Sequence, residues 1–147
     1  TNYKFKLLII GSGENKQKLL DFININKLRS SIKLVNFQKN PFPYLKGADA
    51  FILASMFEGL PNVLLEALTL KKLIISSDCP TGPKEILDYG KNGLIFKMNN
   101  EFDLYKKIIF FIKNKSKCEA LVNRGHNRLT RFDYYRNLEK YSKILDF

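Results

Sequence analysis

The chain has 147 residues, of which 45% are hydrophobic and 13% aromatic, and this is enough apolar material for a buried core. No stretch approaches the roughly 18 uninterrupted apolar residues of a membrane-spanning helix, so the composition predicts a soluble chain. The 25 Lys and Arg outnumber the 14 Asp and Glu, and the charge of +11 favours nucleic acid, anionic lipid or a phosphorylated ligand as partner. We expect a single domain over residues 1–147.

The first residues and the cysteines place this domain in a cellular context. Thr1 is followed directly by a predicted strand, without an initiator Met or a signal sequence, as expected for a domain cut from a longer protein. Cys79 and Cys118 have no C-x-x-C spacing, and the one histidine, His126, is far from Cys79 in sequence. The pattern therefore predicts neither a zinc site nor a disulfide framework, and favours a reducing cytosol.

Short apolar runs alternate with segments of helical periodicity along the chain. The runs that predict strands are Tyr3 to Ile10, Ile32 to Phe37, Ala50 to Ala54, Leu73 to Ser76 and Leu94 to Phe96. Helices are expected over Leu19 to Leu28, through Leu45, from Pro61 as first helical residue to about Leu70, and over Lys84 to Tyr89, Asn100 to Lys113, Ser116 to Arg124 and Arg131 to Leu145. This alternation predicts an α/β fold, with a Rossmann-like parallel sheet flanked by helices.

In parallel sheets of this kind, ligands bind at the carboxyl ends of the strands. Polar and glycine-rich segments follow four of the predicted strands: Gly11 to Gly13, Asn36 to Asn40, Ser55 to Pro61 and Ser77 to Lys84. We therefore expect the functional residues at this edge of the sheet.

The segment around Glu58 and Glu66 carries the clearest chemical signal. Backbone amides at the start of the predicted Pro61 helix, those of Asn62 and Val63 among them, suit a phosphate or diphosphate, and Gly59 lets the ligand come close to the backbone. Glu66 lies about 7 Å further along the helix axis. Two carboxylates would repel phosphates and suit hydroxyl groups on a sugar and a ribose. Taken singly, an acidic residue near a helix start is often only a partner of the helix dipole, and a glutamate within a helix is usually solvated; the pair together with the Gly-Leu-Pro turn favours a functional site.

The stretch from Phe57 to Leu68 resembles the E-x7-E signature of the retaining family 4 (group 1) glycosyltransferases, which have the two-domain GT-B fold. The resemblance extends from about Lys6 to Phe96. It includes Leu8 to Gly13 as a strand with Gly-x-Gly, Asn36 to Pro41 as the base-binding loop, and Ser77 to Leu87 with Gly90 to Leu94 as the following loop, short helix and turn. The chain is thus similar to the C-terminal, donor-binding domain of that family.

The resemblance implies a role for each matching residue. Glu58 would be catalytic and contact the donor sugar, Glu66 would bind the ribose, and the backbone around Gly59, Leu60, Asn62 and Val63 would hold the diphosphate. The base would lie against Phe37, Gln38 and Lys39, and Gly11, Gly13 and Gly82 would shape the cleft. For Gly11 and Gly13 a purely structural turn is an equally good interpretation.

The resemblance also implies the reaction. A sugar would move from a nucleotide diphosphate sugar, with UDP-sugars favoured, to a glycan or lipid-linked acceptor with retention of configuration. No cofactor is expected, and no metal, since an Asp-x-Asp motif is absent. The family's first strand of this domain, its Arg/Lys phosphate clamp and its N-terminal acceptor domain do not match any part of the chain, so we expect the fragment alone to be inactive. The family implies a cytoplasmic location, with peripheral association at the inner face of the membrane.

Two other interpretations compete with this one. The charge of +11 and the many Phe and Tyr suit a nucleic-acid-binding module, but these aromatic residues lie in apolar runs and no nucleic-acid-binding motif is present, so no nucleic acid partner is expected. A nucleotide-binding regulatory domain without transfer activity would share the sheet. Glu58 distinguishes such a regulatory domain from a transferase, because a nucleotide sensor has no need of a carboxylate directed at a sugar.

Overall fold

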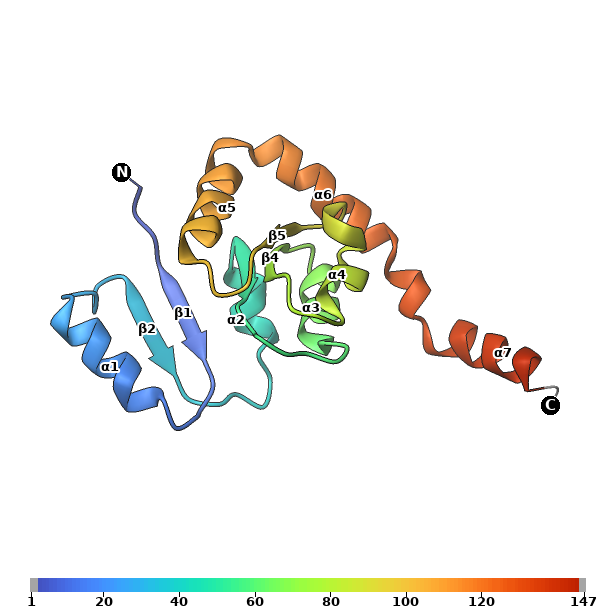
Figure 1. The fold of residues 1–147 in the computed structure, drawn as a ribbon, viewed down its shortest axis with the longest axis horizontal. Coiled ribbons are helices and arrows are strands. Elements are labelled where there is room, and N and C mark those ends of the chain that lie inside the picture. Colours follow the sequence, from blue (N-terminus) through green and yellow to red (C-terminus); the bar gives the residue numbers. More distant parts are fainter. Residues whose placement is uncertain (1–2, 146–147) are drawn as a thin grey trace. The chain divides into compact units, whose positions relative to one another are not determined.

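The computed structural model describes residues 3–145 and has the alternating strands and helices that the sequence predicts (Figure 1). The strands are β1 (Leu7–Ile10), β2 (Ile32–Val35), β3 (Ala50–Leu53), β4 (Leu73–Ser77) and β5 (Leu94–Phe96). The α-helices are α1 (Lys16–Ile25), α2 (Phe42–Gly47), α3 (Asn62–Thr69), α4 (Pro83–Ile86), α5 (Glu101–Lys113), α6 (Lys115–Asn127) and α7 (Tyr134–Ile144). Two short 3-10 helices are η1 (Asp88–Gly90) and η2 (Leu129–Phe132).

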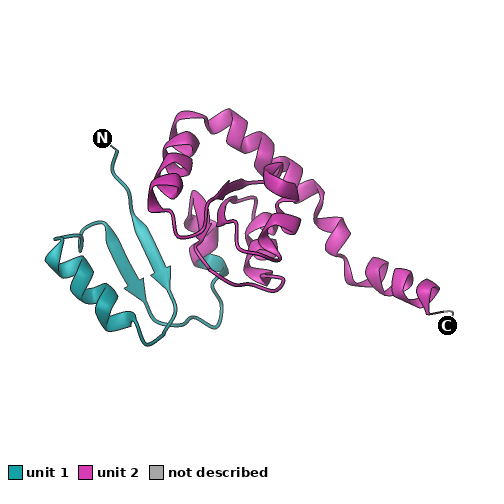
Figure 2. Cartoon of the chain, viewed as in Figure 1, with its two compact units in different colours: residues 1–43 teal, residues 44–147 magenta. Residues whose placement is uncertain are grey.

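The chain forms two compact units, residues 1–43 and residues 44–147 (Figure 2). In the first unit β1 and β2 pair in parallel, with Leu7 opposite Ile32 and Ile10 opposite Val35. The side chain of Ile23 in α1 is buried. The sequence predicts one sheet, whereas the structure describes a two-stranded sheet here and a three-stranded sheet in the second unit. The assignment of residues 1–147 to one domain stays a prediction.

The second unit is built around a parallel sheet in the order β3-β4-β5. Every residue of the central strand β4 is buried. Its side chains alternate between two hydrophobic clusters, as the two-residue repeat of a strand requires. Ile74 packs with Leu64 and Leu68 of α3, while Leu73 and Ile75 belong to the other cluster. Both faces of this sheet are therefore covered, which explains why the predicted strand has a continuous apolar run.

The two clusters come from different helices. Leu64, Ala67 and Leu68 of α3 pack with Ile86 and Leu87 on one side of the sheet. On the other side, Cys118 of α6 packs with Phe96, and apolar side chains of α5 and α6 extend the cluster. Burying a leucine side chain of this kind stabilises the fold by about 1.5 to 3 kcal/mol. The turn between β3 and α3 is thus anchored at both of its ends in well-packed structure.

Several predicted element boundaries were wrong in position, among them those of the first strand and of the helix at Pro61. The first strand begins at Leu7 and not at Tyr3, because pairing with β2 starts only where Leu7 faces Ile32. Helix α3 begins at Asn62, and Pro61 is its N-cap residue with an extended ψ of 101°. The carbonyl of Pro61 still accepts a hydrogen bond from the amide of Leu64 at 3.0 Å, so proline stands just outside the helix that it introduces.

Two predicted helices are interrupted. The helix expected over residues 84–89 ends at Ile86, because Asp88 and Tyr89 have positive φ angles of 46° and 53°. The helix expected over residues 131–145 breaks at Asp133, whose side chain accepts a hydrogen bond from the amide of Arg136 at 2.9 Å. This cap starts α7 as a separate helix.

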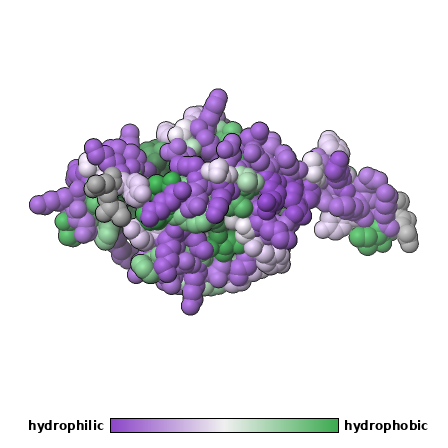
Figure 3. All heavy atoms as spheres, turned by 90° about the horizontal axis from the view of Figure 1, so that it is seen from above, coloured by the Kyte–Doolittle hydropathy of each residue, from purple (hydrophilic) through white to green (hydrophobic). Residues whose placement is uncertain are grey.

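Hydrophilic residues cover most of the face of the molecule drawn in Figure 3, and hydrophobic ones appear at the end of α7. The apolar side chains there include Leu138, Tyr141 and Ile144, which are all exposed. Over the residues that the structure describes, no helix has both the length and the apolar character needed to span a bilayer.

Candidate functional site

The carboxyl ends of the three parallel strands in the second unit lie at one edge of the sheet, and three loops meet there. Ser77, the last residue of β4, donates its hydroxyl hydrogen to the carbonyl of Ser55 in the loop after β3, at 2.6 Å. Asp78 accepts a hydrogen bond from the amide of Met98, which follows β5, at 2.8 Å. These contacts join the loops into one platform at the edge where ligands bind in sheets of this kind.

Six of the predicted site residues lie in the loop between β3 and α3 or in the helix itself. Glu58, Gly59 and Leu60 are in the loop, and Asn62, Val63 and Glu66 are in α3. Glu58 is half-buried, Gly59 is exposed, and Leu60 exposes half of its surface. The next residue, Pro61, is buried. This turn is therefore accessible at Glu58 to Leu60 and anchored immediately afterwards.

The start of α3 has backbone donors available. The amide of Leu64 is used within the helix by the carbonyl of Pro61, but the amides of Asn62 and Val63 have no hydrogen-bond partner within residues 3–145. No side chain caps this end of the helix. Unpaired amides at a helix start and the positive end of the helix dipole attract anions.

Neither predicted carboxylate is neutralised by a neighbour. Along the described chain no ion pair or hydrogen bond involves the carboxylate of Glu58 or that of Glu66. Both residues are half-buried. Glu66 lies four residues after Asn62 and on the same side of α3, because residues at this spacing are neighbours on a helix surface. Leu64 and Ala67 face the core instead.

The loop after β4 packs directly against the Glu58 turn. The hydroxyl of Thr81 donates a hydrogen bond to the backbone carbonyl of Glu58. Gly82 has a φ of 77°, and a Cβ atom at this position would lie 1.9 Å from the carbonyl oxygen of Gly59 and 2.7 Å from Cδ of Pro61. Gly82, predicted to shape the cleft, is therefore buried against the turn itself, where only glycine fits.

Thr81 and Ser77 are the residues that sequence reasoning missed. Their hydroxyl groups link the loop after β4 to the backbone of the loop after β3. The only signal in the sequence is that both residues follow a predicted strand. Their hydrogen-bond acceptors are backbone carbonyls more than 20 residues away, which no side-chain pattern reveals.

The remaining predicted site residues belong to the first unit. The side chain of Phe37 is 71% exposed, and Lys39 is also exposed. Gln38 donates a side-chain hydrogen bond to the carbonyl of Asn36 at 3.1 Å, which stabilises the loop in which they lie. Such an exposed aromatic ring is available for stacking against a flat ligand.

The two predicted cleft glycines of the first unit differ from Gly82. A Cβ atom added to Gly11 or Gly13 would meet no atom of the described chain within 4 Å. Gly11 has a φ of 149°, so its need for glycine is conformational. The carbonyl of Gly13 accepts a hydrogen bond from the amide of Lys16 at 3.1 Å, near the start of α1. The positive φ of Gly11 thus gives a reason for a structural turn at this position, and close approach of a ligand to Gly11 or Gly13 stays a prediction.

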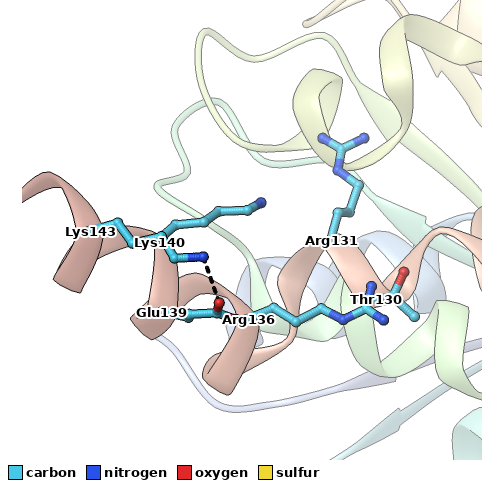
Figure 4. Close-up of a pocket in the computed structure, with 6 residues that line it drawn as sticks. All are labelled: Thr130, Arg131, Arg136, Glu139, Lys140 and Lys143. Atoms are coloured by element: carbon cyan, nitrogen blue, oxygen red, sulfur yellow. Dashed lines mark hydrogen bonds and ion pairs between the residues drawn. The ribbon is translucent and has the colours of Figure 1, made fainter.

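A separate hollow of about 490 Å³ lies against η2 and α7 (Figure 4). It is lined by Thr130, Arg131, Arg136, Glu139, Lys140 and Lys143. Glu139 is paired with Lys143 at 2.7 Å, so the remaining cations leave the hollow positively charged. None of the predicted site residues lines it, and the side chains that form its walls are exposed.

Neither a cluster of metal ligands nor an exposed thiol is found among the described residues. Within the described residues no three His, Cys, Asp or Glu side chains are grouped closely enough to hold a metal ion. Both cysteines are free and buried. Burial raises the pKa of the Cys118 thiol, and the nearby Lys115 partly opposes this shift. A buried, protonated thiol in a hydrophobic cluster is structural and unreactive.

The architecture matches known glycosyltransferases. The chain superimposes on the crystal structure of Anabaena Alr3699/HepE in complex with UDP with a TM-score of 0.86, at 18% sequence identity, over 97% of this chain and 41% of that one. The fold is that of the C-terminal domain of GT-B glycosyltransferases, as the sequence predicts.

Sequence comparison gives the family. Residues 1–128 match the family described as Glycosyl transferases group 1, and the chain belongs to this family. It is 44% identical to the uncharacterized glycosyltransferase MJ1059 of Methanocaldococcus jannaschii, over 92% of this chain. It is 30% identical to the N-acetylgalactosamine-N,N'-diacetylbacillosaminyl-diphospho-undecaprenol 4-alpha-N-acetylgalactosaminyltransferase of Campylobacter jejuni, over 87% of this chain. The chain spans 37% and 35% of the lengths of these two relatives.

Proposed function

We propose that this chain is the donor-binding half of a retaining, family 4 glycosyltransferase that uses a UDP-sugar. One observation carries the proposal: in a chain of the group 1 family, an accessible turn with unneutralised carboxylates leads into a helix start with unpaired amides. The turn lies at the carboxyl edge of a parallel sheet, where such ligands bind.

The diphosphate is assigned to the backbone between Gly59 and Val63. The unpaired amides of Asn62 and Val63 supply donors, and the dipole of α3 adds a positive potential. When the sugar leaves, negative charge builds up on the nucleoside diphosphate. Donors that are already in place stabilise this charge without reorganisation, which lowers the barrier.

The carboxylates are assigned to hydroxyl groups. Glu58 stands before the helix start and contacts the donor sugar, and Glu66 lies further along α3 and binds the ribose. Direct contact of either carboxylate with the diphosphate would be repulsive. Both side chains are half-buried and have no partner among the described residues, so they are free to accept hydrogen bonds from a ligand.

The base is assigned to the loop Phe37–Lys39 of the first unit, with Gly11, Gly13 and Gly82 as cleft-shaping residues. Support comes from the exposure of Phe37 and from the hydrogen bond that orders Gln38. Recognition would use stacking and backbone atoms.

In the reaction, the bond between the anomeric carbon and the diphosphate oxygen breaks, and a bond from that carbon to an acceptor oxygen forms on the same face. The nucleoside diphosphate leaves with the bonding electron pair, and its oxygen takes the proton that the acceptor hydroxyl loses. The proposal assigns neutralisation of the leaving group to backbone donors, with no metal and no cofactor. Transfer that is unchanged by EDTA is the expected result.

The acceptor is proposed to be a glycan or lipid-linked oligosaccharide in polysaccharide or lipopolysaccharide assembly. Support for this acceptor comes from the Campylobacter relative, whose name includes diphospho-undecaprenol. The HepE structure in complex with UDP supports the choice of a UDP-sugar as donor. The charge of +11 suits peripheral association with anionic lipid at the cytoplasmic face of the membrane. Because the chain spans little more than a third of its relatives, we propose that it is inactive alone.

The proposal is tested by Glu58→Ala in the complete polypeptide. Transfer from UDP-sugars should be abolished, while the affinity for UDP should stay within about twofold, because the removed carboxylate contacts the sugar. Glu119→Ala is the matched control, since Glu119 is an exposed glutamate of α6 outside the site. Saturable nucleotide binding without transfer by the wild type, with every donor and acceptor tried, would instead support a regulatory nucleotide-binding domain.

A further inference from the structure

Two adjacent backbone carbonyls of the Glu58 turn face the loop after β4. The carbonyl of Glu58 accepts the hydrogen bond of the Thr81 hydroxyl. The carbonyl of Gly59 points at Gly82: from the Cβ position of Gly82, its oxygen lies at 1.9 Å and its carbon at 3.0 Å. The oxygen is nearer to this position than the carbon, so the C=O bond of Gly59 is directed toward the Gly82 side of the turn.

The direction of these carbonyls fixes the direction of the next two amides. In a planar trans peptide, the N–H group points opposite to the C=O group. No cis peptide is found within the described residues, so this rule applies to both peptide units. The N–H groups of Gly59 and Leu60 are therefore turned away from the Thr81–Gly82 loop and toward the accessible side of the turn.

These two amides precede the unpaired amides of Asn62 and Val63 at the start of α3. Successive N–H groups that face the same side form an anion-binding concavity. Their arrangement depends on the two carbonyls being held on the opposite side. Gly82 holds one by close packing, and Thr81 holds the other by its hydrogen bond.

We infer that Thr81 is a positioning residue for the donor diphosphate. Its hydroxyl fixes the Glu58–Gly59 peptide so that the amide of Gly59 is directed at the ligand. Thr81 acts through the backbone of Glu58 and needs no contact with the substrate. The inference rests on the proposed function, because it assigns a role within the same site.

Thr81→Val tests this role in the complete polypeptide, because valine keeps the shape of threonine and removes the hydroxyl. Titration calorimetry with UDP, GDP and ADP on the wild type first identifies the tightest-binding diphosphate. Thr81→Val should bind that diphosphate about fivefold more weakly, the change expected for one neutral hydrogen bond. It should bind the corresponding nucleoside unchanged, because the nucleoside does not use the Gly59 amide.

Two further variants separate positioning from a general structural role. Thr81→Ser keeps the hydroxyl and should restore diphosphate affinity to within about twofold of the wild type. Thr69→Val removes a hydrogen bond of the same kind, from the Thr69 hydroxyl to the carbonyl of Leu65 at 2.9 Å, at the far end of α3. It should leave diphosphate affinity unchanged.

The outcomes distinguish the two proposals. Equal diphosphate affinity for the wild type and Thr81→Val, with saturable binding by both, would overturn the role of Thr81 and leave the donor site in place. An equal loss of nucleoside and diphosphate affinity in Thr81→Val would also overturn it, because the loop would then support the whole domain. No binding of any diphosphate by the folded wild type would overturn the proposed function and this inference together.

Discussion

Among the glycines near the Glu58 turn, Gly82 should be the one whose replacement by alanine disrupts the turn most. The new Cβ would lie 1.9 Å from the carbonyl oxygen of Gly59, so this carbonyl must retreat by 1.1 Å to reach even a 3.0 Å contact. In addition, alanine would have to adopt the φ of 77° and ψ of −71° that Gly82 has, which costs about 1 to 3 kcal/mol.

The shift of the turn should affect function more than stability. A displacement of about 1 Å at a catalytic site can cost on the order of 100-fold in rate. We therefore expect Gly82→Ala in the complete polypeptide to lose at least tenfold in UDP affinity and about 100-fold in transfer. The free energy of unfolding should fall by about 2 to 4 kcal/mol, from the backbone strain and the overpacking together.

Gly90→Ala is the matched control for Gly82→Ala. Gly90 also has a positive φ, 94°, but a Cβ there would meet no described atom within 4 Å. In Gly90→Ala, the free energy of unfolding should therefore fall only by the cost of the strained backbone, and the affinity for UDP should be unchanged. Urea denaturation and titration calorimetry measure both quantities. If the two variants have equal stability and equal UDP affinity, the reasoning about the Gly59 contact is refuted.

Three further predictions concern the fold around the site. Leu64→Ala should lower the free energy of unfolding by about 2 to 5 kcal/mol in urea denaturation, because Leu64 is fully buried between α3 and β4; a loss below 1 kcal/mol would contradict this. Because burial raises the pKa of Cys118 in the folded protein, the thiol ionises at a lower pH in the unfolded chain than in the folded one. The stability from this group is thus complete below the ordinary thiol pKa and is lost as pH rises through the raised one. Cys118→Ala should show a shallower alkaline loss in pH-dependent denaturation, and an unchanged slope would contradict the burial of the thiol. Asp133→Ala should speed hydrogen exchange in the first turn of α7, since the cap is worth about 1 kcal/mol, and should leave α3 unchanged; protection that is unchanged in α7 would contradict the capping role.

The sequence predicted the elements because local signals were strong. The continuous apolar run of β4 is buried on both faces, and Leu64 and Leu68 follow helical spacing into the core. Boundaries failed where a single backbone angle decided them. Pro61 has an extended ψ because it is the N-cap residue and not the first helical residue. Asp88 and Tyr89 adopt positive φ angles, which the identity of their side chains does not predict.

Sequence alone could predict only the part of the candidate site that is formed by residues close together in the chain. Gly59 to Val63 lie close in sequence, so the turn and the helix start followed from the residues themselves. The contacts of Thr81 and Gly82 with the Glu58 turn join residues that are more than 20 positions apart. Such contacts depend on the packing of neighbouring strands, which no spacing of side chains encodes.

Hydrogen exchange on the complete polypeptide, with and without saturating UDP, tests most directly whether the diphosphate lies on the backbone at the start of α3. The proposed site predicts slower exchange of the amides of Gly59, Leu60, Asn62 and Val63, with no change in α5. UDP binding that slows exchange only in residues 129–143, around the cationic hollow, would contradict the placement of the donor at the Glu58 turn.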